Sequence, residues 1–192
     1  MPPFRKETPK RRDIKTAVGK YHDHREELIK DYKNRCGYCD DVDTWRLVWF
    51  ELDHFVPQKY LKTIKDTDYS NLVYACRSCN NSKRAHWPTL DEKVHNKNNE
   101  GFIDPCDSEY DKQFSRTING RIKHETDLGK WMYYKLKFHK PQHEVIWLIE
   151  GLDKLIEECE ELMTKMDDEI LKNRLLGLYR QYHMYTKQLS SL

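Results

Sequence analysis

The sequence predicts an α+β fold, in which a small core of strands and one helix is held by a four-cysteine zinc site and flanked by helices. Two C-x-x-C pairs, at residues 36–39 and 76–79, predict the zinc site. Runs rich in β-branched and aromatic residues lie between the pairs and predict strands. Two heptad-like stripes within residues 148–189 predict a C-terminal helical hairpin.

The N-terminal third contains an arm, a helix and a strand. Residues 1–12 are rich in Lys, Arg and Pro, and we expect a flexible basic arm there. The core is expected at 13–90, and its first helix at 13–34, where apolar residues recur on one face. The run TWRLVWFELD at 44–53 predicts a strand. A short apolar run, the second cysteine pair and a helix start follow within 71–85.

The C-terminal half divides into a polar region and a helical one. Residues 91–140 are expected to form loops and short elements, a polar and basic accessory region. Within it, GKWMYYKLKFHK at 129–140 could stack bases, but a half-buried element with its lysines in water is the favoured interpretation. Residues 141–192 should form an antiparallel hairpin, with Asp167 or Asp168 capping the second helix. One long helix in a dimer is the alternative.

Charge and hydropathy bound the class of protein. The chain has no apolar run of transmembrane length, and its N-terminus lacks the apolar core of a secretory signal, so we expect a cytoplasmic protein with no membrane partner. Net charge is +2, yet residues 144–173 hold ten acids and three bases. The remaining chain is therefore basic, which suits a nucleic-acid binder. Two ordinary solvated surfaces would give the same imbalance.

The cysteines are expected to bind metal rather than form disulfides. Each C-x-x-C pair can hold one metal from a tight turn, and two pairs complete a closed, structural zinc site. The expected ligands are Cys36, Cys39, Cys76 and Cys79. Cys106 and Cys159 lack partners at useful spacing and are interpreted as small buried apolar residues.

Three motifs together resemble the HNH nuclease family. They are the first C-x-x-C, the string LDHFVP at 52–57, and NLVYAC-x-x-CNNSK at 71–83, so that the resemblance covers about residues 34–88. The family's first motif position falls on His54, its middle asparagine on Asn71 and its last position on Asn80. Many members have histidine at that last position. Asparagine there, and the string Asp53–Gln58, are similar to the HNH domains of RNA-guided CRISPR nucleases.

The resemblance implies a ββα-metal core that cleaves DNA with a divalent cation and leaves a 5′-phosphate and a 3′-hydroxyl. The residues support such chemistry, because the oxygens of Asp53 and Asn80 suit Mg²⁺ or Mn²⁺. His54 is a plausible general base for the attacking water. Asp53 and His54 would point to opposite faces of an extended strand, so we expect a bend there. Asn71 is expected to tie the loop that carries His54.

Basic residues near the second cysteine pair should meet phosphates of the substrate. These candidates for nucleic-acid binding are Arg77, Lys83, Arg84 and His86. Lys83 is also counted among the catalytic residues, because we expect it to contact a phosphate from the helix that follows the second C-x-x-C pair. His86 could replace the histidine missing from the motif, but it lies too far along the chain to be the first choice.

A looser resemblance concerns the cellular role. Residues 102–131 are similar to the region after the nuclease core in small bacterial HNH proteins of Septu-like anti-phage defence systems, where such a protein accompanies an ATPase. This resemblance implies a defence or restriction role, with a partner ATPase or self-association through residues 142–190. A hairpin that merely covers the core is the alternative.

Three other functions stay open at the level of sequence. The chain could be a non-catalytic zinc-dependent DNA-binding module, although pure binding does not need Asp53, His54 and Asn80 together. It could be a nuclease directed at RNA, which uses the same chemistry. It could also be an interaction subunit that stays silent until a partner engages.

Overall fold

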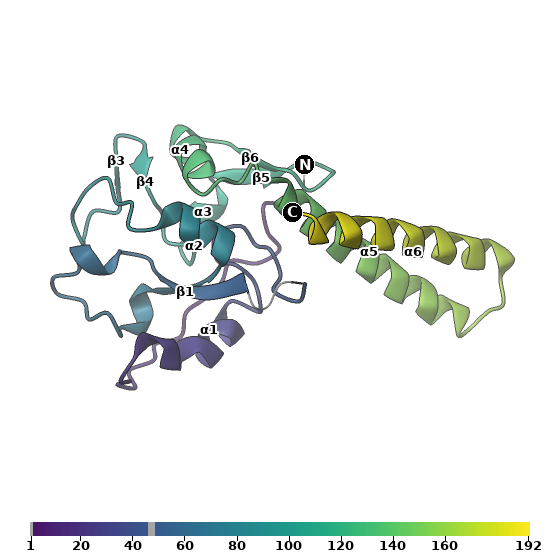
Figure 1. Ribbon diagram of the computed structural model, residues 1–192, viewed down its shortest axis with the longest axis horizontal. Coiled ribbons are helices and arrows are strands. Elements are labelled where there is room, and N and C mark those ends of the chain that lie inside the picture. The colour runs from purple at the N-terminus through teal and green to yellow at the C-terminus, as the bar shows by residue number, and fades with distance from the viewer. Residues whose placement is uncertain (1, 46–48) are drawn as a thin grey trace. The chain divides into compact units, whose positions relative to one another are not determined.

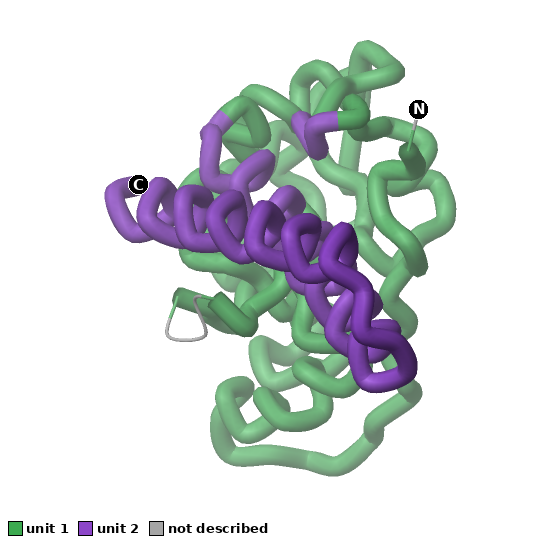
Figure 2. Tube along the Cα trace, turned by 90° about the vertical axis from the view of Figure 1, so that its right-hand side faces the viewer, with its two compact units in different colours: residues 1–118, 122–139 green, residues 119–121, 140–192 purple. Residues whose placement is uncertain are grey.

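The computed structural model describes residues 2–45 and 49–192 and divides into two compact units (Figures 1 and 2). Unit 1 comprises residues 1–118 and 122–139, and unit 2 comprises residues 119–121 and 140–192. The predicted arm, the predicted core and most of the predicted accessory region therefore lie in unit 1. The predicted hairpin lies in unit 2, together with residues 119–121 and 140 of the accessory region.

The N-terminal basic arm is packed onto unit 1, in contrast to the flexible segment predicted for residues 1–12. Phe4 is 3% exposed, and its ring centroid lies 5.1 Å from that of Phe114. Arg5 is also buried and donates to the backbone oxygen of Gly37 at 3.1 Å. The prediction was wrong because the arm's single phenylalanine supplies an apolar anchor that its overall composition hides.

The first helix is shorter than the predicted span of 13–34. A 3₁₀ helix, η1, covers Tyr21–His24, and α1 covers Arg25–Asp31. The residues before Tyr21 are not helical. Their chain runs back along α1, and the backbone N–H of Arg12 donates to the Asp31 carboxylate at 2.7 Å. In one continuous helix the ends of this span would lie about 28 Å apart, so the contact excludes a helix over the whole of 13–34.

The centre of unit 1 is a two-stranded antiparallel sheet followed at once by a helix (Figure 1). Strand β1 covers Phe50–His54 and β2 covers Leu72–Cys76, with His54 opposite Leu72 and Phe50 opposite Cys76. Helix α2 covers Arg77–Lys83 and begins directly after β2. The strand predicted at 44–53 thus begins only at Phe50, and residues 46–48 lie outside the described part.

The remainder of unit 1 consists of short elements. They are η3 Gln58–Tyr60, η4 Tyr69–Asn71, β3 Asn96–Lys97 paired with β4 Glu100–Gly101, α3 Ser108–Asp111, β5 Phe114–Arg116 paired with β6 Ile122–His124, and α4 Asp127–Lys135. Helix α4 buries Met132 and exposes Lys130, and Lys137 just after the helix is also exposed, as the half-buried interpretation of this segment requires.

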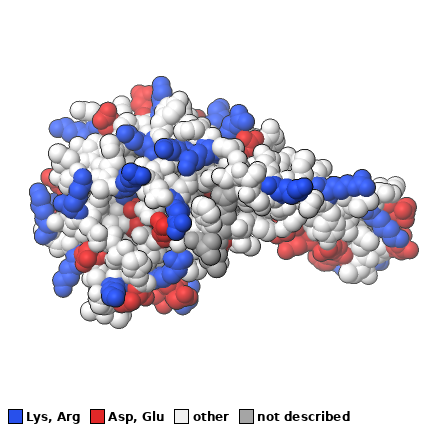
Figure 3. All heavy atoms as spheres, viewed as in Figure 1, with Lys and Arg blue, Asp and Glu red and all other residues white. Residues whose placement is uncertain are grey.

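Unit 2 is a hairpin of two long helices, as predicted. Helix α5 covers Pro141–Met163 and α6 covers Glu169–Ser190, and Leu152, Ile156 and Leu178 pack between them. In Figure 3, Lys and Arg side chains line one edge of the hairpin, and Asp and Glu gather below them. Among the described residues, no helix is both long enough and apolar enough to cross a membrane.

Of the two aspartates predicted as candidates for the cap of α6, Asp168 is the one that serves. Its side chain accepts from the backbone N–H of Ile170 at 2.7 Å and of Leu171 at 3.2 Å. Asp167 instead pairs with Lys172 on the surface.

We expect Asp168→Ala to destabilise the hairpin by about 1 kcal/mol, because two N–H groups at the start of α6 lose their acceptor. In a protein of this size such a loss lowers the melting temperature by about 2–4 °C. Asp167→Ala is the matched control and should shift it less, since an exposed ion pair contributes little. Equal melting temperatures for the two variants would contradict the assignment of the cap.

Candidate active site

The four cysteines of the two C-x-x-C pairs come together in unit 1. Cys36 and Cys39 lie in the turn after α1, Cys76 ends β2, and Cys79 lies in the first turn of α2. Their four Sγ atoms all lie within 4.8 Å of one another, and all four residues are buried.

The geometry of this cluster suits zinc. With Zn–S bonds of about 2.3 Å, a regular tetrahedron places its sulfurs about 3.8 Å apart. The Sγ atoms of Cys39 and Cys76 are 3.7 Å apart. The backbone N–H of Cys79 also donates to the Cys76 sulfur at 3.4 Å, which favours a thiolate there. The cluster could therefore hold one zinc ion with no position left for a substrate.

Asp53, His54 and Asn80 line one hollow of about 410 Å³ on unit 1. Asp53 and His54 end β1, and Asn80 lies in the middle of α2. Pro57, Tyr21, Lys59 and Arg84 line the same hollow. Although Asp53 and His54 are consecutive residues of a strand, both line the same hollow.

Asp53 is held by two buried partners. Its Oδ2 accepts from the Tyr38 hydroxyl at 2.6 Å and pairs with the Lys83 ammonium at 2.8 Å. Burial raises the pKa of Asp53, whereas Lys83 and Tyr38 act in the opposite direction. Because both described contacts go to Oδ2, Oδ1 is the oxygen that could face a cation.

Lys83 lies in the interior, where the sequence predicted a phosphate contact. Its side chain is 0% exposed, and its ammonium group donates to the backbone oxygen of His54 at 2.8 Å in addition to pairing with Asp53. The inner face of α2 carries Lys83, so in this structure it cannot reach a phosphate. It contacts Asp53 and His54 of β1 instead.

The ring of His54 has a defined orientation. Its Nε2 lies 2.7 Å from the backbone oxygen of Asp66. A carbonyl oxygen can only accept, so Nε2 carries the proton of the neutral ring and Nδ1 carries the lone pair. The ring of Tyr21 lies edge-on to that of His54, with centroids 4.6 Å apart. His54 is 8% exposed, so its rotation is restricted on several sides.

Asn71 binds the loop that follows His54. Its Nδ2 donates to the backbone oxygen of Val56 at 3.0 Å, and its Oδ1 accepts from the Val56 N–H at 2.8 Å. The backbone oxygen of Asn71 also accepts from the Phe55 N–H at 2.8 Å. These are contacts of the kind the sequence predicts for this asparagine.

Asn80 is oriented by Glu51, a residue that the motif analysis missed. The Asn80 Nδ2 donates to Glu51 Oε2 at 2.7 Å, and Glu51 Oε1 pairs with Arg77 at 2.8 Å. The amide nitrogen of Asn80 therefore faces Glu51, and its oxygen is left as a possible cation ligand. Glu51 lies two residues before Asp53, on the same face of β1.

The predicted nucleic-acid contacts are distributed unevenly. Of the four, Arg84 is the one that lines the hollow. Arg77 is engaged with Glu51, as described above, and His86 packs beside the ring of Trp131 at 5.6 Å between centroids. Partial burial and the charge of Lys135 lower the pKa of His86. His86 does not line the hollow, which agrees with its rank as a second choice.

Lys59 and Tyr21 line the hollow without a signal in the sequence that could have identified them. Lys59 lies just after the string Asp53–Gln58, and Tyr21 lies before the first C-x-x-C pair. Both reach the site through the fold of distant segments.

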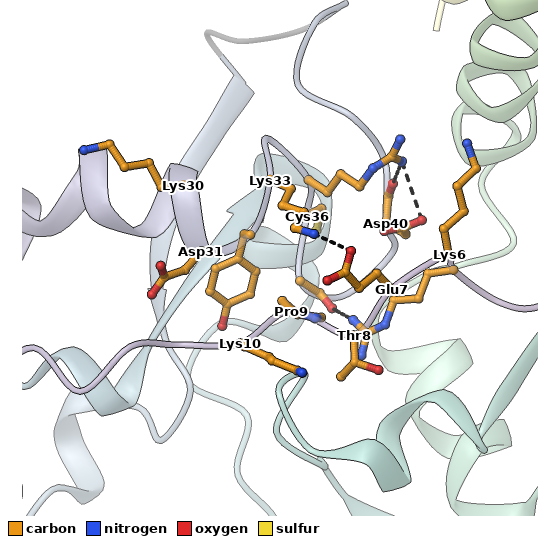
Figure 4. Close-up of a pocket in the computed structure, with 14 residues that line it drawn as sticks. Lys6, Glu7, Thr8, Pro9, Lys10, Lys30, Asp31, Lys33, Cys36 and Asp40 are labelled. Carbon is orange, nitrogen blue, oxygen red and sulfur yellow. Dashed lines mark hydrogen bonds and ion pairs between the residues drawn. The ribbon is translucent and has the colours of Figure 1, made fainter.

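A second hollow of about 450 Å³ lies between the N-terminal arm and the first cysteine turn (Figure 4). Its lining is basic, but Lys33 pairs with Glu7 and Arg35 pairs with Asp40 across it. None of the predicted catalytic residues lines it.

The two-stranded sheet, the helix that follows it and the four-cysteine cluster define a ββα-metal core. Comparison with protein families agrees, since residues 36–86 match the family described as HNH endonuclease. That stretch of the chain is therefore an HNH domain, and it includes all four cysteines together with Asp53, His54 and Asn80. No curated protein and no solved structure gave a significant match to the chain.

We expect Cys79→Ser to lose the zinc, because three thiolates leave one position of the tetrahedron open. Wild-type protein should contain about one zinc ion per chain, measured by elemental analysis after gel filtration. Cys106→Ser is the control, because Cys106 lies outside the cluster, and it should retain zinc. A folded Cys79→Ser variant with wild-type melting temperature and no zinc would overturn the structural role of the site.

We expect Glu51→Ala to weaken binding of Mg²⁺ or Mn²⁺ at the hollow by about tenfold, because the Asn80 amide is no longer held with its oxygen outward. Titration calorimetry on zinc-loaded protein measures this. Glu109→Ala, which removes another surface glutamate engaged with a cation, is the control. Equal affinities in the two variants would show that Glu51 does not orient the ligand.

Proposed function

We propose that the HNH domain is a metal-dependent endonuclease that hydrolyses phosphodiester bonds in DNA. The observation that carries the proposal is the convergence of a general base, a carboxylate and an amide oxygen on one hollow, from His54, Asp53 and Asn80. A binding module needs no such combination, whereas phosphodiester hydrolysis needs a proton acceptor for water and positive charge against the phosphate.

The chain's own residues have distinct roles in this reaction. His54 accepts the proton of the attacking water at Nδ1, while Asp66 holds Nε2. The water oxygen forms a bond to phosphorus as the bond to the 3′ oxygen breaks, which leaves the 5′-phosphate that the family resemblance implies. Mg²⁺ or Mn²⁺ held by Asp53 and Asn80 would supply positive charge against the leaving oxygen.

Two cations at the hollow, Lys59 and Arg84, are proposed to meet the phosphates of the substrate. They replace Lys83 in this role. Arg84 has a positive φ of 47° at the end of α2, an unusual conformation for a residue other than glycine. Its N–H donates to the Asn80 backbone oxygen at 2.8 Å, which closes the last turn of α2.

A non-catalytic zinc-dependent DNA-binding domain is the second candidate. The ion pair between Asp53 and Lys83 favours it, because a buried carboxylate that is already neutralised could serve the fold alone. Cleavage of RNA is the third, since nothing at the hollow selects the sugar. These readings differ in measurable activity.

We propose unit 2 as an interaction element for a partner ATPase or a second copy of the chain. Its α5 is strongly acidic, and Leu155, Leu162 and Leu176 are exposed on the hairpin. A role in anti-phage defence or restriction would follow from such a partner, and it rests on the resemblance of residues 102–131.

We expect the zinc-loaded protein to cleave plasmid DNA with Mg²⁺, and His54→Ala to reduce the rate by at least about 100-fold, because the attacking water loses its proton acceptor. His183→Ala, which removes an exposed histidine of α6, is the control and should cut as wild type does. Agarose gels with plasmid and with a transcribed RNA of the same sequence measure both activities.

Cleavage by His54→Ala at the wild-type rate would remove His54 as the base. DNA binding without cleavage by any of the three proteins, with zinc retained, would favour the binding module. Cleavage of RNA alone would replace the proposed substrate.

A further inference from the structure

We propose that Glu92 is a positioning residue for the active site, which fixes the loop whose backbone oxygen orients the ring of His54. The inference rests on the proposed function, because it assigns a role to the orientation of a general base. Glu92 lies 38 positions along the chain from His54, outside the matched HNH stretch.

The Glu92 carboxylate is surrounded by donors from one short segment. Its Oε1 accepts from the backbone N–H groups of Lys62, Thr63 and Ile64 at 3.1, 3.1 and 2.9 Å. Its Oε2 accepts from the Thr63 hydroxyl at 2.8 Å and shares the Thr63 N–H at 3.0 Å. The residue is 3% exposed. Three successive N–H groups thus converge on one buried anion, as they do in backbone anion-binding nests.

These bonds favour the ionised form and lower the pKa of Glu92 to about 2. A carboxyl with a lowered pKa adds stability above its ordinary pKa, and that stability is lost as the pH falls towards 2. The carboxylate therefore holds the segment throughout the pH range in which a nuclease would work.

The chain segment that carries Glu92 is itself anchored to the core. The backbone oxygen of its neighbour Asp91 accepts from the Trp87 ring N–H at 2.7 Å. Trp87 is buried and packs edge-on against Phe55, the residue that follows His54, with ring centroids 5.3 Å apart. The segment of Glu92 is thus anchored to the same part of the core that carries His54.

The held segment leads directly to the carbonyl that contacts His54. The turn over residues 65–68 follows Ile64 directly, and the Asp68 N–H closes it by donating to the Lys65 oxygen at 3.0 Å. The oxygen of Asp66 in that turn lies 2.7 Å from His54 Nε2. The next oxygen, of Thr67, lies 3.2 Å from the ring nitrogen Nε2 of the buried His24.

Regular secondary structure does not hold this turn. Between η3 and η4, residues 61–68 belong to no helix or strand. In the described part of the chain, the N–H groups of residues 62–64 have Glu92 as their sole partner. Without the carboxylate these N–H groups would turn to water, and the turn with the Asp66 oxygen would lose its fixed position.

A displaced Asp66 oxygen no longer selects the Nε2–H tautomer of His54. The ring then divides its time between two tautomers, and one of them presents a proton where the water needs an acceptor. A displaced His54 ring also lowers the rate, because small misplacements of a catalytic group cost large factors in rate. Glu92 therefore acts on the reaction through His54 and touches no substrate.

The test is Glu92→Gln, which keeps the size of the side chain but replaces one accepting oxygen with a donor. Two-bond ¹H–¹⁵N spectra of zinc-loaded, histidine-labelled protein report the tautomer of His54, whose signals are assigned by their absence in His54→Ala. Wild type should show one tautomer with a protonated Nε2, and Glu92→Gln a mixture. We expect kcat for DNA cleavage to fall about tenfold, with KM changed less than about twofold.

One variant serves as the matched control. Glu26→Gln makes the same change at an exposed glutamate of α1 and should keep the wild-type tautomer and kcat. A folded Glu92→Gln variant with the wild-type tautomer and kcat would overturn the inference, and so would a Glu26→Gln variant with the same tautomer mixture as Glu92→Gln.

A milder variant keeps the test decisive if Glu92→Gln fails to fold. Thr63→Val removes one donor and leaves the carboxylate, so it should move the tautomer signals in the same direction by a smaller amount; unchanged signals would overturn the inference. Absence of cleavage by wild type would refute the proposed function instead, and the tautomer comparison would still decide the role of Glu92.

Discussion

The four-cysteine cluster is the constraint on which the rest of unit 1 depends. A two-stranded sheet is marginally stable by itself, and α2 is only two turns long. A zinc ion held by Cys36, Cys39, Cys76 and Cys79 would join the turn after α1, which carries Cys36 and Cys39, to the point where β2 becomes α2. The same turn contains Tyr38, whose hydroxyl donates to Asp53. The loop that would hold the metal thus also holds the carboxylate of Asp53.

A buried ion pair connects this scaffold to the site. Lys83 and Asp53 lie almost entirely out of water, where an unpaired charge would be costly, so each needs the other. Lys83 also donates to the backbone oxygen of His54. Because residues three apart share a helix face, Lys83 pointing inward places Asn80 beside it, towards the same strand. The interior charge pair thereby fixes the orientation of α2 over β1.

Local patterns in the sequence predicted the parts of the structure that depend on local chemistry. The cysteine spacing predicted the cluster, and the two heptad-like stripes predicted the two helices of the hairpin. The errors concern contacts between distant segments. The arm was read as flexible because its partner Phe114 lies 110 residues away. Lys83 was assigned to the surface because lysine usually lies there, and its buried partner could not be read from spacing.

The candidate site shows the same difference between local motifs and contacts of distant segments. His54, Asp53 and Asn80 were recognisable because they belong to motifs with fixed spacing. Glu51 and Glu92 were not, since each acts by a hydrogen bond to a residue or segment at least 28 positions away. Their importance could be read from neither composition nor periodicity, because a glutamate in a polar stretch is ordinarily a solvated surface residue.

Charge at the hollow follows from these internal pairings. Lys83 balances the carboxylate of Asp53, and Arg77 balances Glu51. Within the described part of the chain, Lys59 and Arg84 at the same hollow have no carboxylate partner. The hollow therefore has a positive bias before any cation binds, even though it contains the carboxylate that a cation would need.

Such a field attracts a polyanion more strongly than it attracts a free divalent ion. An arriving phosphate would offset the positive charge of Lys59 and Arg84, and a divalent cation would then meet Asp53 Oδ1 in a less repulsive field. If the proposed function holds, the affinity for the cation would depend on whether the nucleic acid is bound.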